Sequence, residues 1–180
     1  MNPVARGAVD EMSDREILEK AYKLAFEYES RYGNCPQCVI AAISDVFSLN
    51  LDDLFKASHG LAGGLGLSGY GTCGALSGGS IILSHFYGRD RRNFDKRVMK
   101  SYEKSKLLYD RFVEEFGGCT CREVQMKLFG RSFNLWDAED YERFEEMGGH
   151  RDKCPSVTGK VAQWVAEILL EDPSLKPLKR

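Results

Sequence analysis

Apolar residues recur at helical spacing through most of this chain, and no segment shows the alternation of a strand or a βαβ rhythm. The first apolar stripe, from Ile17 to Tyr28, follows a capping-box pair, Ser13 and Glu16, and stops at Gly33. Further helices are expected over residues 36–47, 52–58, 93–116, 120–129, 138–147 and 155–172, and another just before Gly88. A short hairpin over residues 130–136 is left open. The pattern predicts an all-α fold.

The length and composition fit one domain. A chain of 180 residues with 43% hydrophobic residues is long and apolar enough to bury a core. We expect a flexible N-terminus over residues 1–12, a helical domain over residues 13–172 and a C-terminal tail over residues 173–180. The prediction is a single compact multi-helix domain with a glycine-rich loop.

That loop is the most unusual segment. Residues 60–79 hold nine of the 18 glycines, and an apolar run follows them. Glycine permits positive φ angles and lets other groups come close to the backbone. The segment lacks the G-K-[ST] signature and a preceding strand, so it does not match a phosphate-binding loop. We interpret it as a loop that leads into a buried helix.

Charge and hydropathy exclude several classes of protein. With 25 basic and 27 acidic residues, the net charge of −2 predicts no nucleic-acid partner. No stretch is apolar enough to span a bilayer, so no membrane insertion is expected. The first residues lack the apolar region of a secretory signal, which favours the cytoplasm. The basic segment Arg89–Arg92 is expected to be a solvated connection between helices.

The chain has six cysteines, a set that in a reducing compartment is typical of metal ligands or redox centres rather than of structural disulfides. They are Cys35, Cys38, Cys73, Cys119, Cys121 and Cys154.

Four of these cysteines fall at predicted helix starts. Cys35 and Cys154 each precede a proline, Cys121 follows the capping residue Thr120, and Cys73 stands where the glycine-rich loop enters a helix. The free N–H groups and the positive dipole end of a helix start favour a thiolate, which predicts lowered thiol pKa values. If the four helix starts converge, they form a site suited to an anionic cluster.

Other arrangements of the cysteines stay open. Cys35 and Cys38 form a C-x-x-C pair, so a thiol–disulfide oxidoreductase is one alternative. A zinc-binding structural or interaction module is another. Val39 follows the second cysteine where a c-type haem site needs histidine, so no haem is expected. Cys119 is too close to its neighbour Cys121 for both to face one centre, and one of the two is assigned an auxiliary role.

Among other metal-binding side chains, His59 is the best placed because it adjoins the glycine-rich loop, whereas His85 and His150 are not expected to be ligands. The acidic segment 139–146 is expected to be a solvated helix face, with docking of a basic redox partner as the alternative.

The cysteine pattern resembles a known family. Residues 73–78 read CGALSG, a CGAxxG motif, between an upstream Asn34-Cys35 and the downstream Cys121-Arg122-Glu123 and Cys154-Pro155. This order is similar to the redox-active proteins named for their C_GCAxxG_C_C pattern, and to the cysteine-bearing part of split-Soret cytochromes c. The likeness runs from about residue 15 to about residue 170.

The resemblance implies a helical redox domain and places the four family cysteines at Cys35, Cys73, Cys121 and Cys154, with Gly74 and Gly78 of the motif beside the cofactor. The split-Soret relatives imply an iron–sulfur centre, [2Fe-2S] or [4Fe-4S], and a homodimer, but their haem motif is absent here. The expected function is electron transfer to or from an unidentified redox partner protein, or redox sensing, and the resemblance implies no particular substrate.

Overall fold

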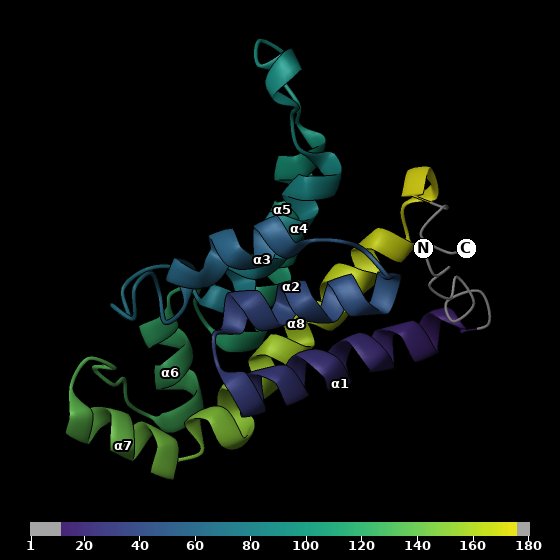
Figure 1. Ribbon diagram of the computed structural model, residues 1–180. Helices are drawn as coiled ribbons and strands as arrows, with labels where there is room; N and C mark the ends of the chain where they lie inside the picture. Colours follow the sequence, from purple (N-terminus) through teal and green to yellow (C-terminus); the bar gives the residue numbers. More distant parts are fainter. Residues whose placement is uncertain (1–11, 176–180) are drawn as a thin grey trace.

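The computed structural model describes residues 12–175, and within that range the chain forms eight α-helices and no β-strand (Figure 1). The all-α prediction is confirmed, and no hairpin forms at residues 130–136. Residues 1–11 and 176–180, where the expected N-terminus and most of the expected tail fall, lie outside the described range. The helices are α1 (Asp14–Tyr32), α2 (Cys35–Phe47), α3 (Asp52–Ser58), α4 (Gly74–Tyr87), α5 (Lys100–Phe116), α6 (Cys121–Phe129), α7 (Ala138–Glu146) and α8 (Cys154–Leu170).

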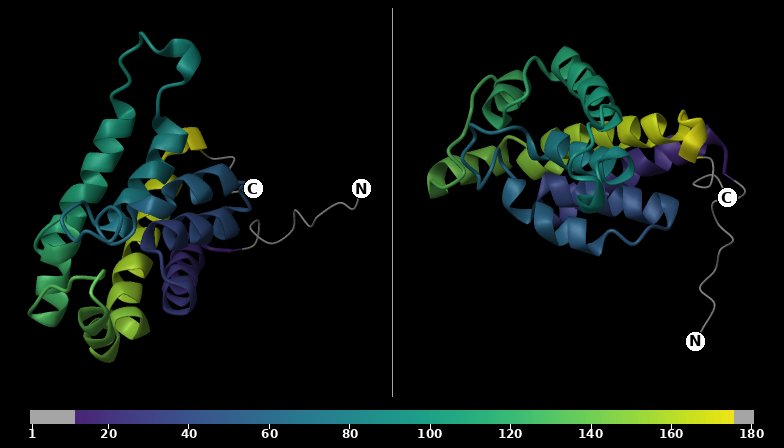
Figure 2. Two further views of the ribbon diagram at one scale, coloured as in Figure 1. Left: turned by 60° about the vertical axis from the view of Figure 1, so that its left-hand side comes forward. Right: turned by 90° about the horizontal axis from the view of Figure 1, so that it is seen from above.

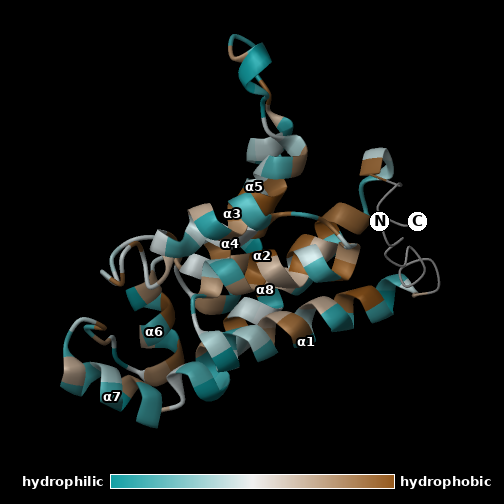
Figure 3. Ribbon diagram, in the orientation of Figure 1, coloured by the Kyte–Doolittle hydropathy of each residue, from teal (hydrophilic) through white to brown (hydrophobic). Residues whose placement is uncertain are grey.

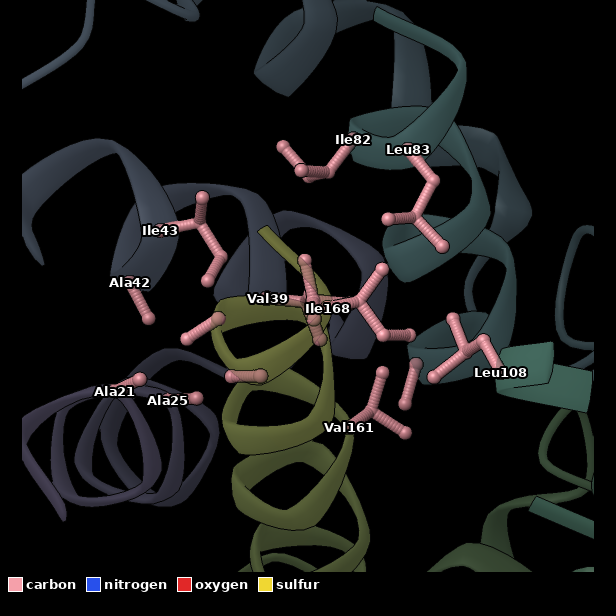
Figure 4. Packing of buried hydrophobic residues seen from close by; sticks show 14 of the residues in the cluster. Ala21, Ala25, Val39, Ala42, Ile43, Ile82, Leu83, Leu108, Val161 and Ile168 are labelled. Atoms are coloured by element: carbon pink, nitrogen blue, oxygen red, sulfur yellow. The ribbon is translucent and has the colours of Figure 1, made fainter. Parts of the chain in front are cut away.

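The core surrounds α8, which packs against α1, α2, α4 and α5. Figure 4 shows Val161 and Ile168 of α8 among buried side chains of these helices, including Ile43 of α2 and Leu108 of α5. On α1, the inward positions are small, Ala21 and Ala25, both fully buried. Small side chains allow the two helix axes to lie close together, so α1 and α8 share a long contact. The core fixes the relative positions of α2, α4 and α8, three of the helices at whose starts the cysteines lie.

Local signals set the helix ends as predicted. Ser13 with Glu16 and Thr120 with Glu123 both form complete capping boxes, which start α1 and α6. Gly33 ends α1. The glycine-rich segment is a 3-10 turn over His59–Leu61 followed by turns that lead into α4, as expected.

The predicted helix over residues 93–116 is wrong at its beginning, because α5 starts only at Lys100. Residues 88–99 form a projecting connection between α4 and α5 with only a 3-10 turn at Arg91–Asn93 (Figures 1 and 2). Its side chains are mostly hydrophilic and exposed (Figure 3), so no apolar stripe holds them to the core as a helix. On α5, Leu108 is fully buried while Tyr102 is 67% exposed.

The crossing of α2 and α4 requires a glycine. A Cβ at Gly78 would stand 2.7 Å from the carbonyl oxygen of Pro36 and 2.8 Å from its Cα. These are backbone atoms near the start of α2, which cannot move without shifting the whole helix. The close approach brings the first turns of the two helices together.

We predict that Gly78→Ala lowers the free energy of unfolding by about 1–3 kcal/mol, because overpacking at the α2–α4 crossing outweighs the better helix propensity of alanine. Gly60→Ala is the matched control, since a Cβ there meets nothing within 4 Å. Urea denaturation followed by circular dichroism measures both variants. Equal stability of the two would contradict a backbone-limited crossing.

Candidate four-cysteine site

Four cysteines from distant parts of the sequence line one cavity of about 410 Å³. Cys35 is the first residue of α2, Cys73 immediately precedes α4, Cys121 opens α6 and Cys154 opens α8. The helix-start positions expected from the sequence are therefore confirmed, and the helix starts converge. All six cysteines carry free thiols.

Backbone hydrogen bonds tie the glycine-rich loop to the start of α6. The Cys73 N–H donates to the Cys119 carbonyl over 2.7 Å, and the Cys121 N–H donates to the Gly71 carbonyl over 3.0 Å. Gly64 comes so close that a Cβ there would lie 2.9 Å from the Cβ of Cys121. The loop and α6 thus place Cys73 and Cys121 on the same wall of the cavity.

The same loop holds two leucines in the left-handed region, Leu65 with φ 68° and Leu67 with φ 60°. This conformation costs free energy for any residue with a Cβ. Leu67 lines the cavity, whereas Leu65 is exposed. The strained backbone therefore turns one of two nearby leucines inward to line the cavity.

Gly74 and Gly78 of the CGAxxG motif do not line the cavity. They pack against the first turn of α2: a Cβ at Gly74 would stand 2.5 Å from the Sγ atom of Cys35. In this chain the two glycines allow the start of α4 to approach the start of α2. The proximity brings Cys73 near enough to Cys35 for the two thiols to interact.

The remaining two cysteines lie outside the cavity lining. The buried Cys38 thiol donates to the Gly33 carbonyl over 2.9 Å, and Cys119 interacts with Tyr109. Of the Cys119–Cys121 pair, Cys121 therefore lines the cavity and Cys119 does not.

The expectation that helix starts lower the thiol pKa values is wrong for three of the four cavity cysteines. Interaction with the Cys73 thiol and burial raise the pKa of Cys35, and burial raises the pKa of Cys154. Burial raises the pKa of Cys121 to about 12. The loss of water around each thiol outweighs the helix dipole, which acts only over the first turn.

The rest of the lining mixes apolar side chains with polar ones, among them Gln125 and Glu29. Gln125 is buried: its side-chain amide points to the Cys121 Sγ atom over 3.7 Å while its oxygen accepts the Phe133 N–H over 2.8 Å. Glu29 also lines the cavity and is only 1% exposed. The apolar lining residues are Ala62, Leu67, Val124, Leu135, Phe144 and Val157.

Glu29 was not predicted from the sequence, and His59, the histidine judged best placed there, does not line the cavity. Glu29 lies on α1 in a stripe that otherwise holds buried apolar residues, at the spacing Ala21, Ala25, Glu29. A carboxylate at an apolar position of a helical stripe is the signal that could have identified it. His150 lines the cavity, whereas His59 lies outside it and bonds to Asn34 and Gln37.

Within residues 12–175, no three side chains of histidine, cysteine, aspartate or glutamate are arranged to hold a single metal ion. No helix in the described part of the chain has the length and apolar character needed to cross a membrane.

Comparison with known proteins agrees with the cysteine pattern. The model of one protein family, described as "Putative redox-active protein (C_GCAxxG_C_C)", matches residues 33–168 and so includes all four cavity cysteines. No curated protein and no solved structure matches the chain significantly. Because the match covers most of the chain, this protein belongs to the C_GCAxxG_C_C family of redox-active proteins.

Proposed function

We propose that Cys35, Cys73, Cys121 and Cys154 hold an iron–sulfur cluster, and that the protein transfers electrons or senses redox state through it. The observation that carries this proposal is the convergence of four thiols, from four separate helix starts, on one cavity. Four cysteine thiolates are the standard ligand set of both [2Fe-2S] and [4Fe-4S] clusters. When bound, such a cluster supplies a one-electron couple.

The chemistry of the cavity fits this group. Burial raises the pKa of Cys121 and Cys154, and the Cys73 thiol together with burial raises the pKa of Cys35, so ligation by these three would release protons and replace them with the positive charge of iron. The Gly63 N–H bonds to the sulfur of Cys35, and the Gln125 amide faces the sulfur of Cys121. Such donors to ligating sulfurs tune the potential of a cluster.

A single zinc ion and a cluster place different demands on the spacing of the thiols. Tetrahedral zinc with bonds of about 2.3 Å needs four sulfurs within about 4 Å of one another. No three candidate ligands among the described residues are grouped for a single ion, although four cysteines line the cavity. A cluster spreads its cysteine ligands over several iron atoms, so it accepts a wider separation of the sulfurs.

The proximity of Cys35 and Cys73 favours a second candidate, a redox-active dithiol formed by this pair. It would cycle between two thiols and a disulfide with release of two electrons and two protons to an acceptor protein disulfide. The Cys35–Cys38 pair is less suitable. The Cys38 thiol is turned to the Gly33 carbonyl outside the cavity, and burial strongly raises its pKa, which disfavours the reactive thiolate.

The proposal also includes the compartment, the redox partner and the oligomeric state of the protein. Six free thiols suit the reducing cytoplasm. A one-electron carrier protein is the partner that the cluster would require, and the resemblance to split-Soret cytochromes extends the proposal to a homodimer.

We predict that protein purified without oxygen, or reconstituted with iron and sulfide, contains iron and labile sulfide and absorbs in the visible range. Serine in place of any of the four cavity cysteines should lower cluster content by about tenfold or more, since even outer-shell changes weaken metal sites by 10–100-fold. Cys119→Ser is the matched control because that thiol lies outside the cavity, and it should retain the cluster.

The same preparations separate the candidates. Colourless anaerobic protein without iron or labile sulfide would overturn the cluster. A metal-free two-electron couple that is lost in Cys73→Ser would establish the dithiol instead. One tightly held zinc ion without any redox couple would establish the structural zinc module.

A further inference from the structure

Three side chains from different elements form a line between the four-cysteine cavity and the surface. The Oε1 atom of Glu29, on α1, lies 3.9 Å from the Nε2 atom of His150, in the π-helical turn before α8. The Nδ1 atom of His150 lies 2.5 Å from the Oε1 atom of Glu145, on α7. Glu29 is buried, whereas the side chains of His150 and Glu145 are 28% and 36% exposed. The line therefore runs from the interior to solvent.

Its inner end is a carboxyl group with an unused oxygen. The Oε2 atom of Glu29 is buried and has no hydrogen-bond partner. Burying a charged carboxylate whose oxygen has no hydrogen-bond partner costs free energy, and this cost favours the neutral form of the group. Burial raises the pKa of Glu29 to about 7, although His150 and Cys38 act in the opposite direction.

The groups around Glu29 leave its charge largely uncompensated. No lysine or arginine of the described residues forms an ion pair with it, and His150 is the one basic side chain within 4 Å. Arg31, on the same helix, lines the cavity but makes no ion pair with Glu29. The other titratable groups that act electrostatically on Glu29 or feel its charge are Cys35, Cys38, Cys121 and Cys154.

We propose that Glu29, His150 and Glu145 form a proton path to the cavity, and that Glu29 takes up one proton when one electron enters the redox centre there. This inference rests on the proposed function. The electron comes from a one-electron donor, the proton comes from solvent through Glu145 and His150, and oxidation returns both. The net charge of the cavity region is then the same in both redox states.

The geometry suits an imidazole relay. A histidine can accept a proton at one ring nitrogen and release another from the second, and here the two nitrogens face two different carboxyl groups. The outer link is within hydrogen-bond distance. The inner link of 3.9 Å exceeds that distance by about 1 Å, so a small rotation of either side chain, or a bridging water, completes the path.

The physical reason for such a path is the burial of Glu29 beside the cysteines. An electron added to a poorly solvated site repels the nearby Glu29 carboxylate and raises its pKa. Proton uptake removes that repulsion. The carboxyl group therefore acts on the potential of the centre, while His150 and Glu145 act on the rate at which the proton arrives.

We predict that the reduction potential of the reconstituted wild-type protein falls with rising pH above about pH 7, by up to about 59 mV for each tenfold drop in proton concentration. Below Glu29's pKa the carboxyl is protonated in both states, so the slope should flatten. Glu29→Gln should abolish the slope. Dithionite titration at a series of pH values measures it, and Glu167→Gln, which removes a partly exposed carboxylate paired with Arg111, should keep it.

Substitution of His150 should change the rate of reduction rather than the pH dependence of the potential. His150→Gln should leave the slope intact but slow the proton-linked reduction by about 100-fold, as expected when a proton carrier is lost. Stopped-flow reduction in light and heavy water measures this rate. A slope that persists in Glu29→Gln, a potential that does not vary with pH in the wild type, or an unchanged rate in His150→Gln would overturn the path.

A test on cofactor-free protein separates this inference from the cluster itself. The raised pKa means that folded Glu29 keeps its proton while unfolded Glu29 loses it above about pH 4.5, so the wild type loses stability as pH rises from about 4.5 to about 7. Relative to Glu29→Gln, its unfolding equilibrium constant should rise by about 100-fold over that range in urea titrations. An unchanged ratio would show that Glu29 ionises as in water and would overturn the path whether or not a cluster forms.

Discussion

The close approach of α2 and α4 is the constraint on which the site depends. Gly78 and Gly74 of α4 leave no room for a Cβ against Pro36 and Cys35 of α2. A side chain at either position would push the two helix starts away from each other, and Cys73 would move away from Cys35. The spacing of the CGAxxG motif is thus explained by packing: glycines four residues apart lie on one helix face and together create one flat contact surface.

The electrostatics of the cavity follow from competition between two effects. Helix starts favour thiolates by a fraction of a charge within one turn, whereas burial among apolar side chains disfavours any anion by several kcal/mol. For Cys121 and Cys154 burial wins, and for Cys35 the Cys73 thiol and burial together raise the pKa. A site of this kind is a poor nucleophile but a good ligand set, because a bound cation supplies the charge that displaces the protons. The same argument distinguishes it from the low-pKa cysteines of disulfide oxidoreductases.

Local sequence signals predicted the helices and most of their boundaries. The capping boxes at Ser13 and Thr120 and the prolines after Cys35 and Cys154 depend only on neighbouring residues, so they are readable without tertiary structure. The start of α5 was not readable in this way, because helical spacing alone does not say whether a face has anything to pack against.

The residues of the site also fall into two groups, those that local sequence identifies and those that only the fold brings together. Four cysteines at helix starts could be identified from the sequence, but their meeting depends on how α8 orders the surrounding helices. Glu29 is 121 residues from His150 along the chain, and no local pattern links them. His59 was preferred over His150 because it is near the glycine-rich loop in sequence, whereas the turn before α8 is near the cavity in space. Long-range packing of this kind is the part that a single sequence does not reveal.

The cavity walls and the helical core differ in what holds them in place. The core of α1, α2, α4 and α8 is continuous and fully buried, whereas the walls include a loop with two strained leucines and a π-helical turn. A ligand that binds the folded cavity stabilises the walls as well, because its binding free energy adds to that of folding. Occupation of the site should therefore stiffen the glycine-rich loop and the turn that carries His150 more than the core. Binding in the cavity would in this way also fix the distance between His150 and Glu29 that proton transfer requires.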